Sequence, residues 1–480
     1  KVRLKQRLKD AIANSKAIAN LADNPLLLTM IAILNRRQEL PRDRTDLYDQ
    51  ASRVLLYQWD VDHKRLQMPM DAIGRREKQE MLRLIAYEMQ AGAAGLKGNL
   101  ISADRLIRIL TNYLRDQGFS EPREKASRLI QQLRERNFIL CYRGADTYGF
   151  MHRTFLEYFC AVEIVHRFEK QRTLTFEQLR DEIFGQHWQD ETWHEVFRLI
   201  CGMIDVSFTT DLIDFLMHQE INYSDYLEKE WLQYTGQSRL EPKGLKHLFL
   251  ASDCFSEISN PERAFKISHK LVDALKQQIL SPEIQLTRKT ASEILHRIAC
   301  DFVHFDNLDW IKKRIISTES SVVQCAAVAV FAEHTSSDSE TLVRLKRYLE
   351  KGQDWGVRLG AVRAINRHYI HDSETLPLLK RVSEEDEDWE VRSAAIEGIS
   401  RHFIKQDGVY DLLCHIVQVD AFARMMTWQN NPRKTALQGL CENSPIDTKI
   451  IDLLKDRATN DPDKQLRQWA QEQLETLEWS

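Results

Sequence analysis

Residues 137–162 read NFILCYRGADTYGFMHRTFLEYFCAV, and this stretch decides how the N-terminal part of the chain folds. Positions 137–142 are rich in the β-branched and aromatic residues that favour strands, and Gly144 opens a turn of Gly, Ala, Asp and Thr. Residues 148–152 then return toward the first strand. The stretch therefore predicts a β-hairpin.

An amphipathic helix is predicted to follow the hairpin without a linker. Its apolar positions recur at helical spacing and are Phe155, Phe159, Val162 and Val165. Thr154 is placed to cap this helix, with Glu157 three residues later as in a capping box. Phe155, Tyr158 and Phe159 are expected in the core. His152 is expected at the joint between strand and helix, where its side chain can reach a group outside its own domain.

Three predicted helices precede the hairpin, at about residues 76–90, 102–117 and 121–136. Three helices closed by a two-stranded wing describe a winged-helix domain, which we expect over residues 66–168. The third helix carries basic residues that could contact phosphates: Lys125, Arg128, Arg134 and Arg136. It also carries Glu121, Glu124 and Glu135. We interpret it as a solvated face of mixed charge, and DNA binding is a less favoured alternative.

Residues 1–65 predict a compact helical subdomain. A helix is expected over residues 2–20, and Asn24 and Pro25 are suited to begin a second, buried helix. Thr45 is expected to cap a third helix. Its inward-facing residues are predicted to be Leu47, Ala51, Val54, Leu55 and Trp59.

The composition limits the classes of protein. The chain of 480 residues is 43% hydrophobic, which suits about three domains of roughly 100 to 200 residues each. Its 17 glycines and 11 prolines are few for this length and favour helices. The net charge of -4 offers no overall attraction to nucleic acid or membrane. No apolar run reaches the roughly 18 residues that span a bilayer, and no signal peptide opens the chain.

The cysteines indicate the cellular compartment of the protein, and the first residue suggests that the sequence is a fragment. The chain has 8 cysteines: Cys141, Cys160, Cys201, Cys254, Cys300, Cys325, Cys414 and Cys441. They form no CxxC pair and lie mostly in apolar helical patterns, which is typical of reduced core residues in a cytoplasmic protein. The sequence does not begin with Met, and we expect it to be a fragment of a longer protein.

Three stretches resemble NACHT-type signalling ATPases of the STAND class, in the region after the nucleotide-binding core. They are NPLLL at residues 24–28, LPRDRTDLYDQA at 40–51, and the pattern Phe150-x-His152-x-x-Phe155-x-Glu157-Tyr158-Phe159. A looser similarity occurs at residues 193–200, and the whole resemblance covers roughly residues 1–167. The family includes relatives of animal NLR sensors and many bacterial members. This sequence contains no GxxxxGK[ST] loop and no Walker B strand, so it should not hydrolyse ATP alone and no catalytic residue is expected.

The resemblance implies two nucleotide-binding residues. Pro25 would lie against the adenine, because a proline ring offers a flat apolar surface to a base. His152 would donate a hydrogen bond to the β-phosphate of ADP, more strongly when protonated, and hold the winged helix against the nucleotide core. ADP or ATP, with Mg in the missing core, is the expected cofactor of the full-length protein, and none is expected for this fragment alone. The alternatives are a helix-start proline and a histidine hydrogen-bonded within the hairpin.

Residues 169–280 read as a helical connector without assigned chemistry. His187, Glu191 and His194 are close enough in sequence to suggest zinc, but their spacing is not a known ligand pattern and no fourth donor is evident. A packed helix is the simpler interpretation, with inward-facing residues Trp188, Trp193, Val196 and Leu199. No metal site is predicted in the chain.

The last two hundred residues repeat. The sequence DSETL at 338–342 recurs at 372–376, and Asp354-Trp-Gly-Val-Arg358 recurs as Asp388-Trp-Glu-Val-Arg392. A core of the type x-R-x-x-A starts at Thr287, Val323, Val357, Val391, Pro432 and Leu466. The steps between these starts are 36, 34, 34, 41 and 34 residues. Such a period indicates an α-solenoid, and the small alanines make residues 281–480 resemble HEAT repeats.

Within each repeat, the Asp-Trp pair is expected to cap the second helix and to anchor it between repeats. Six basic residues could line one side of the stack: Arg358, Arg363, Arg367, His368, Arg392 and Arg401. For Arg358 and Arg392 we favour ion pairs with acids of adjacent repeats over a charged recognition surface. The acidic run at 384–388 is expected in a loop.

These features predict a mainly α chain with a helical subdomain, a winged helix with a small β-hairpin wing, a connector and a HEAT-like solenoid. We interpret it as the regulatory and sensor portion of a nucleotide-switched NACHT-type ATPase, by resemblance one of bacterial antiphage defence. ADP would hold a closed state, and a protein ligand on the repeats would favour an open state that exchanges to ATP and self-oligomerises. The alternatives are a non-enzymatic interaction scaffold and, less favoured, a DNA-binding regulator.

Overall fold

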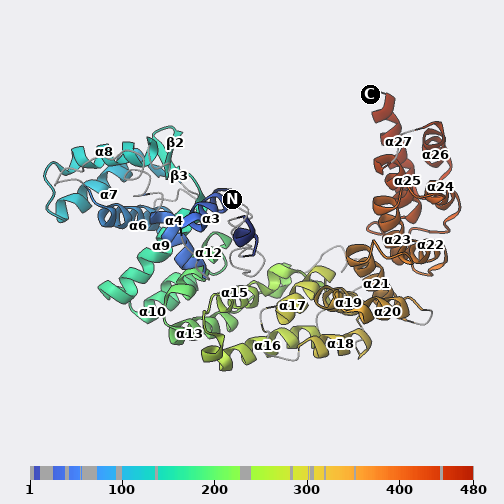
Figure 1. Cartoon of the computed structure of the whole chain (residues 1–480), viewed down its shortest axis with the longest axis horizontal. Coiled ribbons are helices and arrows are strands. Elements are labelled where there is room, and N and C mark those ends of the chain that lie inside the picture. The colour runs from blue at the N-terminus through green and yellow to red at the C-terminus, as the bar shows by residue number, and fades with distance from the viewer. Residues whose placement is uncertain are drawn as a thin grey trace. The chain divides into compact units, whose positions relative to one another are not determined.

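The computed structural model of the chain describes residues 5–10, 25–37, 40, 43–53, 56, 73–92, 100–135, 139–226, 239–281, 285–300, 302, 307–317, 320–350, 353–443 and 447–478. Its elements form two compact units (Figure 1). Unit 1 comprises Lys1–Glu220 and Lys246–Leu271, and unit 2 comprises Ile221–Leu245 and Val272–Ser480. Nearly all of the described elements are helices, which confirms the predicted mainly α fold.

Unit 1 begins with helices α3 (Pro25–Arg37) and α4 (Arg44–Arg53), which contact each other. Helix α3 starts at Pro25 as predicted, and Asn24 lies outside the described residues. The predicted cap of α4 is wrong, because the side chain of Asp43, not Thr45, accepts a hydrogen bond from the Asp46 amide at 2.9 Å. Of the helix predicted over residues 2–20, only 5–10 are described, and they are helical. The predicted inward-facing Leu47 and Ala51 are buried, whereas Val54, Leu55 and Trp59 lie outside the described residues.

The predicted winged helix is confirmed. Its helices are α6 (Arg75–Ala91), α7 (Ala103–Asp116) and α8 (Pro122–Glu135), and its wing is the hairpin of β2 (Leu140–Gly144) and β3 (Thr147–Phe150). Sequence reasoning missed strand β1 (Ile101–Ser102), which pairs antiparallel with β3 and makes a three-stranded sheet of order β1-β3-β2. A strand of two residues that leads directly into a helix cap has too little alternation to be detected.

Helix α9 (Arg153–Val165) follows the wing and is the central helix of unit 1. It contacts α4, α6, β3 and α12, and every residue from 155 to 161 is buried, so the predicted amphipathic character is wrong. The predicted cap is also wrong, because the N-cap residue is His152 and no side chain accepts a hydrogen bond there. Glu157 is buried and receives a hydrogen bond from Arg153 at 2.7 Å instead of capping the helix.

Further helices complete unit 1 around α9. They are α10 (Phe176–Gln178), α11 (Gly185–His187), α12 (Glu191–Met203), α13 (Val206–Met217) and α15 (Lys246–Phe255). π-Helical turns at His166–Gln171 and Leu179–Phe184 follow α9 and α10. The side chains of Asp190 and Asp205 cap α12 and α13 by accepting backbone hydrogen bonds, each at 2.9 Å. Helix α16 (Phe265–Leu280) begins in unit 1 and ends in unit 2.

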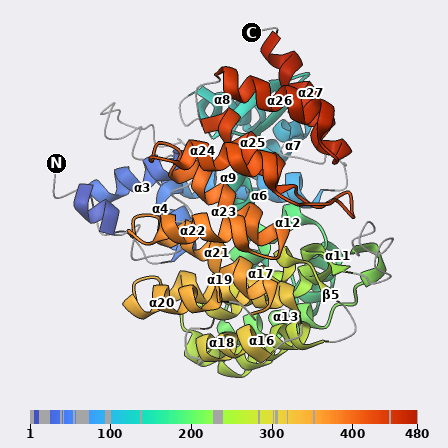
Figure 2. The ribbon, with the colours of Figure 1, turned by 90° about the vertical axis from the view of Figure 1, so that its right-hand side faces the viewer.

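Unit 2 is a stack of helical hairpins, shown in succession in Figure 2. The first helices of the hairpins are α18 (Asn307–Ser317), α20 (Ser339–Tyr348), α22 (Thr375–Glu385), α24 (Val409–Val419) and α26 (Thr448–Asn460). The second helices are α19 (Ser321–Thr335), α21 (Trp355–His368), α23 (Trp389–His402), α25 (Pro432–Asn443) and α27 (Lys464–Glu478), preceded by α17 (Arg288–Cys300). Each first helix contacts the second helix that follows it, and α17, α19, α21, α23 and α25 contact one another in sequence.

Two short strands lie at the beginning of unit 2. Strand β4 (Arg239–Leu240) pairs in parallel with β5 (Gln285–Leu286). The Leu240 carbonyl accepts hydrogen bonds from the Thr287 amide at 3.2 Å and from the Thr290 hydroxyl at 2.6 Å. This pairing therefore fixes the start of helix α17.

The repeat deduced from the sequence coincides with the second helices. The alanines of the six x-R-x-x-A cores are Ala291, Ala327, Ala361, Ala395, Ala436 and Ala470, and all have 0% exposure. The predicted caps are also confirmed, because Asp354 accepts from the Gly356 amide at 2.7 Å and Asp388 from the Glu390 amide at 2.8 Å. These small, buried side chains lie where neighbouring second helices contact each other.

Arginines of the x-R-x-x-A cores join successive repeats, as favoured for Arg358 and Arg392. Arg358 donates to both carboxylate oxygens of Asp386, at 2.8 and 2.9 Å, and Arg392 does the same to Asp420, at 2.8 and 3.1 Å. Arg433 repeats the arrangement with Asp461 at 2.9 Å for both contacts. We call these the arginine–aspartate pairs. Residues 384 and 385 of the acidic run lie in the last turn of α22 rather than in the predicted loop.

Loss of the most buried arginine–aspartate pair should destabilise unit 2. Arg433 and Asp461 have side-chain exposures of 3% and 0%. Arg433→Ala would leave Asp461 buried without its main partner, which typically costs about 3 to 5 kcal/mol of unfolding free energy. The control is Arg401→Ala, because Arg401 is 65% exposed in its pair with Glu397 and should change stability by less than about 1 kcal/mol. Urea unfolding followed by circular dichroism measures both, and equal effects would contradict the role of the pair.

Protonation of Glu157 should make the stability of unit 1 depend on pH. Burial raises the pKa of Glu157 from its ordinary 4.5 to about 7, although the hydrogen bond from Arg153 opposes this. The folded state then binds a proton that the unfolded chain has lost, so the unfolding free energy should fall between pH 4.5 and 7, by on the order of 3 kcal/mol. Thermal melts across this range should show the fall in the native chain and in the exposed control Glu169→Gln, but not in Glu157→Gln. The same slope in Glu157→Gln would assign it to another group.

Candidate functional site

His152 lies at the joint between β3 and α9, as predicted. Its backbone carbonyl accepts a hydrogen bond from the Phe155 amide at 3.2 Å, and its side chain is half-buried. Within the described part of the chain its ring makes no hydrogen bond, so the alternative of a histidine bonded within the hairpin is not observed. Burial lowers the pKa of His152, so the ring is neutral at pH 7 and offers one N–H donor and one acceptor.

Aromatic side chains connect this joint to helix α4. The rings of Tyr48 and Tyr158 stack with centroids 5.4 Å apart, and Tyr48 meets Phe155 edge to face at 6.3 Å. Phe159 lies between Phe155 and Phe150, at 6.4 and 6.2 Å. The predicted core role of Phe155, Tyr158 and Phe159 is therefore confirmed. Tyr48 comes from the sequence stretch 40–51 and Tyr158 from the stretch 150–159, so these two family-like stretches contact each other directly.

A buried ion cluster extends the same junction. Arg44 is 7% exposed and donates to Glu195 of α12 and to Glu257, which follows α15. Arg198 of α12 donates to the same oxygen of Glu257 at 3.0 Å. Burial raises the pKa of Glu195, and Arg44 opposes that rise because its positive charge favours the carboxylate. Glu195 belongs to the looser sequence similarity at residues 193–200, so a third family-like stretch meets the other two.

Pro25 is the second predicted nucleotide-binding residue. It begins helix α3, but its side chain lies outside the described part of the structure. The adenine contact of Pro25 therefore stays a prediction.

The residues that suggested DNA binding by α8 and zinc binding near α12 have other partners in the structure. On α8, Arg128 pairs with Glu124 at 3.1 Å and Arg134 with Glu135 at 2.5 Å, which confirms the predicted mixed-charge face. In α11 and α12, the ring of His187 stacks on Trp193 with centroids 4.3 Å apart. The Nε2 atom of His194 lies 2.8 Å from the carbonyl oxygen of Trp188. The predicted inward-facing residues are all buried: Trp188, Trp193, Val196 and Leu199.

Unit 2 carries a cavity of about 560 Å³ that sequence reasoning missed. Its lining includes Trp355, Trp389, Trp428, Arg288, Arg363 and Glu390. Trp389 packs against Phe422 and Trp428, with ring centroids 5.9 and 6.1 Å apart, so the predicted anchor also forms a cavity wall. The recurrence of Trp355 and Trp389 at the repeat offset could have indicated two walls of this cavity. Trp428 does not follow that offset, so the repeat pattern does not reveal it.

The cavity lining carries three arginines and three acidic residues, and two of the arginines approach the same carboxylate. Arg288 lies 2.6 Å from Glu390, and Arg363, with 44% exposure, lies 3.6 Å from the same oxygen. The hydroxyl of Ser393 also lines the cavity, is buried, and has no hydrogen-bond partner among the described residues. Buried polar groups normally have a partner, so this hydroxyl can receive one from a bound group. Of the other basic residues expected on this side, Arg367 is 70% exposed and lies 3.7 Å from Glu333.

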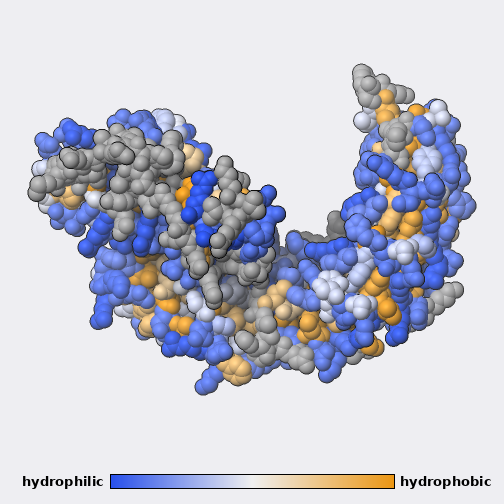
Figure 3. Space-filling view, viewed as in Figure 1, coloured by the Kyte–Doolittle hydropathy of each residue, from blue (hydrophilic) through white to orange (hydrophobic). Residues whose placement is uncertain are grey.

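The visible surface suits specific polar contacts better than burial of one large apolar face. Figure 3 shows apolar residues scattered among hydrophilic ones on both units. Among the described residues, no helix combines the length and apolar character required to cross a membrane.

Comparison with known families identifies two parts of the chain. Residues 44–164 match the family of winged helix-turn-helix domains C-terminal to NACHT. Residues 308–400 and 342–427 match HEAT repeats. No curated protein and no solved structure matches the chain significantly. The first match begins at Arg44 and includes His152, and the second includes Trp355, Arg363 and Trp389 of the cavity lining but not Arg288 or Trp428. The chain therefore contains a NACHT-associated winged helix followed by HEAT-like repeats, which identifies it as the C-terminal portion of a NACHT protein.

Proposed function

We propose that the chain is the regulatory and sensor portion of a nucleotide-switched NACHT signalling protein. The observation that carries this proposal is the junction on α9, where three family-like stretches contact one another through the Tyr48–Tyr158 ring pair and the Arg44–Glu195 ion pair. These contacts hold α4, α9 and α12 in one rigid arrangement beside His152. A movement of His152 is thus coupled to movement of the whole junction.

We call the proposed hydrogen bond from His152 to the β-phosphate of ADP the nucleotide latch. The protonation and hydrogen bonding of His152 support it. Its neutral ring has a donor without a partner among the described residues, beside a helix N-terminus. A phosphate oxygen can accept from the ring, and a nearby negative charge would raise the pKa of His152 and strengthen the bond. ADP held in this way between His152 and a nucleotide-binding core in the full-length protein would favour the closed state. Exchange to ATP, self-oligomerisation, a cytoplasmic location and a role in antiphage defence belong to the same proposal.

The HEAT repeats supply the partner-binding surface in this proposal. The cavity offers three tryptophan rings beside a carboxylate shared by two arginines, which suits a peptide segment with an aromatic or aliphatic side chain next to a charged one. An interaction scaffold is the second candidate, because the whole cavity is formed by unit 2 and does not depend on a nucleotide.

Replacing His152 should weaken the latch. In the full-length protein, His152→Ala would remove one hydrogen bond to a charged group, worth about 1.5 to 3 kcal/mol, and lower ADP affinity by about tenfold or more. The variant should lose co-purified ADP, measured by HPLC after denaturation, and signal more strongly without a stimulus. The control is His218→Ala, because His218 is exposed in the same unit. Equal ADP content in the native protein and His152→Ala would refute the latch, and no nucleotide in any of the three would favour the scaffold.

Replacing residues of the cavity should weaken peptide binding by unit 2. Peptides selected from a displayed random library against the native chain should bind Trp428→Ala and Arg363→Glu at least tenfold more weakly. Trp428 is 40% exposed and Arg363 is 44% exposed, so neither change should unfold the chain. Lys449→Glu, on α26 and outside the cavity lining, is the control, because Lys449 is 51% exposed, and it should bind normally. Selected peptides that bind all variants equally would place recognition elsewhere on the repeats.

A further inference from the structure

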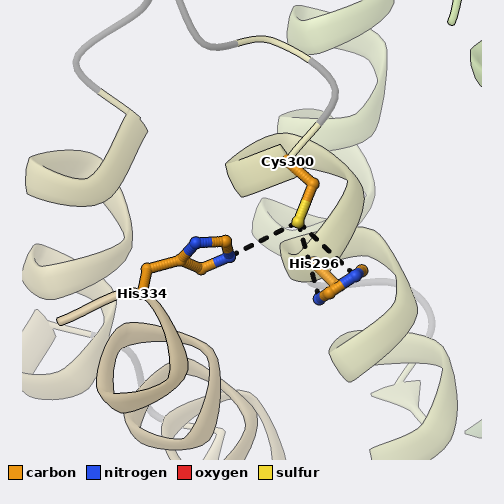
Figure 4. Close-up of side chains that lie close together, drawn as sticks. All are labelled: His296, Cys300 and His334. Atoms are coloured by element: carbon orange, nitrogen blue, oxygen red, sulfur yellow. Dashed lines mark hydrogen bonds between the residues drawn. The ribbon is translucent and has the colours of Figure 1, made fainter. Parts of the chain in front are cut away.

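Two histidines and a cysteine of unit 2 point toward one another between helices α17 and α19 (Figure 4). His296 and Cys300 are four residues apart on α17 and so lie on the same face of that helix. His334 lies in the last turn of α19, the next second helix in the stack. All three are at least partly exposed to solvent, which gives an ion a path to them.

We propose that His296, Cys300 and His334 bind a transition-metal ion of the Zn²⁺ type. Their candidate ligand atoms all lie within 4.8 Å of one another. The sulfur of Cys300 lies 3.4 Å from Nε2 of His296 and 3.4 Å from Nε2 of His334. In a tetrahedral site with Zn–S near 2.3 Å and Zn–N near 2.0 Å, a sulfur and a nitrogen ligand are about 3.5 Å apart. The two sulfur–nitrogen distances therefore already match those of a tetrahedral site.

Glu333 lies beside the three ligands but is not part of the group whose ligand atoms lie within 4.8 Å of one another. Its Oε2 atom lies 4.0 Å from Nδ1 of His296, and its side chain is 33% exposed. The Oε1 atom lies 3.7 Å from Arg367, so the carboxylate is held beside Nδ1 of His296 and favours the tautomer that leaves Nε2 for the ion. Three protein ligands leave the fourth tetrahedral position of the ion to a water molecule.

The ligand set selects the class of metal. Thiolate and imidazole ligands suit Zn²⁺ and similar ions, whereas Mg²⁺ and Ca²⁺ require oxygen ligands. Binding displaces the thiol proton of Cys300 to solvent and leaves the two imidazoles neutral, so the affinity should rise with pH. The ion would join two successive second helices at the start of the repeats, and within the described residues no other histidine and cysteine group has this geometry.

Metal content of the purified chain tests the site directly. After saturation with ZnCl₂ and desalting, mass spectrometry should find about one zinc per native chain and less than a tenth of that in Cys300→Ser and in His334→Ala. The controls Cys441→Ser and His402→Ala, which replace residues of the same types on later second helices, should keep the native ratio. A native chain that retains no zinc, or variants that retain as much as the controls, would overturn the proposal.

Spectroscopy and stability identify the ligands independently of total metal. Loading with Co²⁺ should produce a sulfur-to-metal charge-transfer band that Cys300→Ser lacks and Cys441→Ser keeps. EDTA should lower the melting temperature of the native chain, but not that of His334→Ala, whose replaced side chain is exposed and whose helix should stay folded by circular dichroism. Zinc binding without a sulfur band in the native Co²⁺ form would remove Cys300 from the site and refute the assignment.

Discussion

Burial of helix α9 on nearly all sides is the constraint on which unit 1 depends. A helix with seven consecutive buried residues, 155 to 161, must be covered by other elements all the way round. Helix α6, strand β3, helix α4 and helix α12 provide that cover. The wing and the helices before it are therefore parts of one core, and His152 is fixed by the strand that ends and the helix that begins beside it.

Buried ion pairs fix the orientation of the helices that pack around this apolar core. Arg44 bridges Glu195 and Glu257 in a buried position, where an unpaired charge would be costly, so α4 can take only the orientation that brings these groups together. The neighbouring Tyr48 then stacks on Tyr158. Apolar burial brings the helices together, and the ion cluster selects how they lie. The proposed latch relies on this rigidity, because a loose joint could not transmit the position of one imidazole.

Unit 2 follows a different, one-dimensional logic in which each repeat contacts its neighbours. Alanines allow the second helices to approach closely, and a Cβ atom on Gly356 would lie only 1.9 Å from the Ser321 carbonyl oxygen of the preceding second helix. The arginine–aspartate pairs then join one repeat to the next at a fixed distance of 28 residues. The candidate binding sites of unit 2 use residues that do not follow the repeat pattern. They are Trp428 in the cavity, and the His296, Cys300 and His334 group between α17 and α19.

The sequence by itself determined the elements and the repeat. Turn residues, caps and apolar spacing placed α6, α7, α8, the wing and the six repeat cores, because these signals act within a few residues or recur at a fixed offset. It also predicted the ion pairs of Arg358 and Arg392, since both arginines precede acids at matched positions.

Only the tertiary structure decided what those elements bring together. The cap of α4, the pairing of β1 with β3 and the burial of Glu157 depend on which neighbouring group makes each hydrogen bond in the folded chain. Local sequence patterns do not distinguish these neighbours. Arg44 meets Glu195 across 151 residues, and Cys300 meets His334 across 34, so neither cluster leaves a motif in the sequence. Distances between helices follow from how side chains fill the space between them, and that is a property of the folded chain alone.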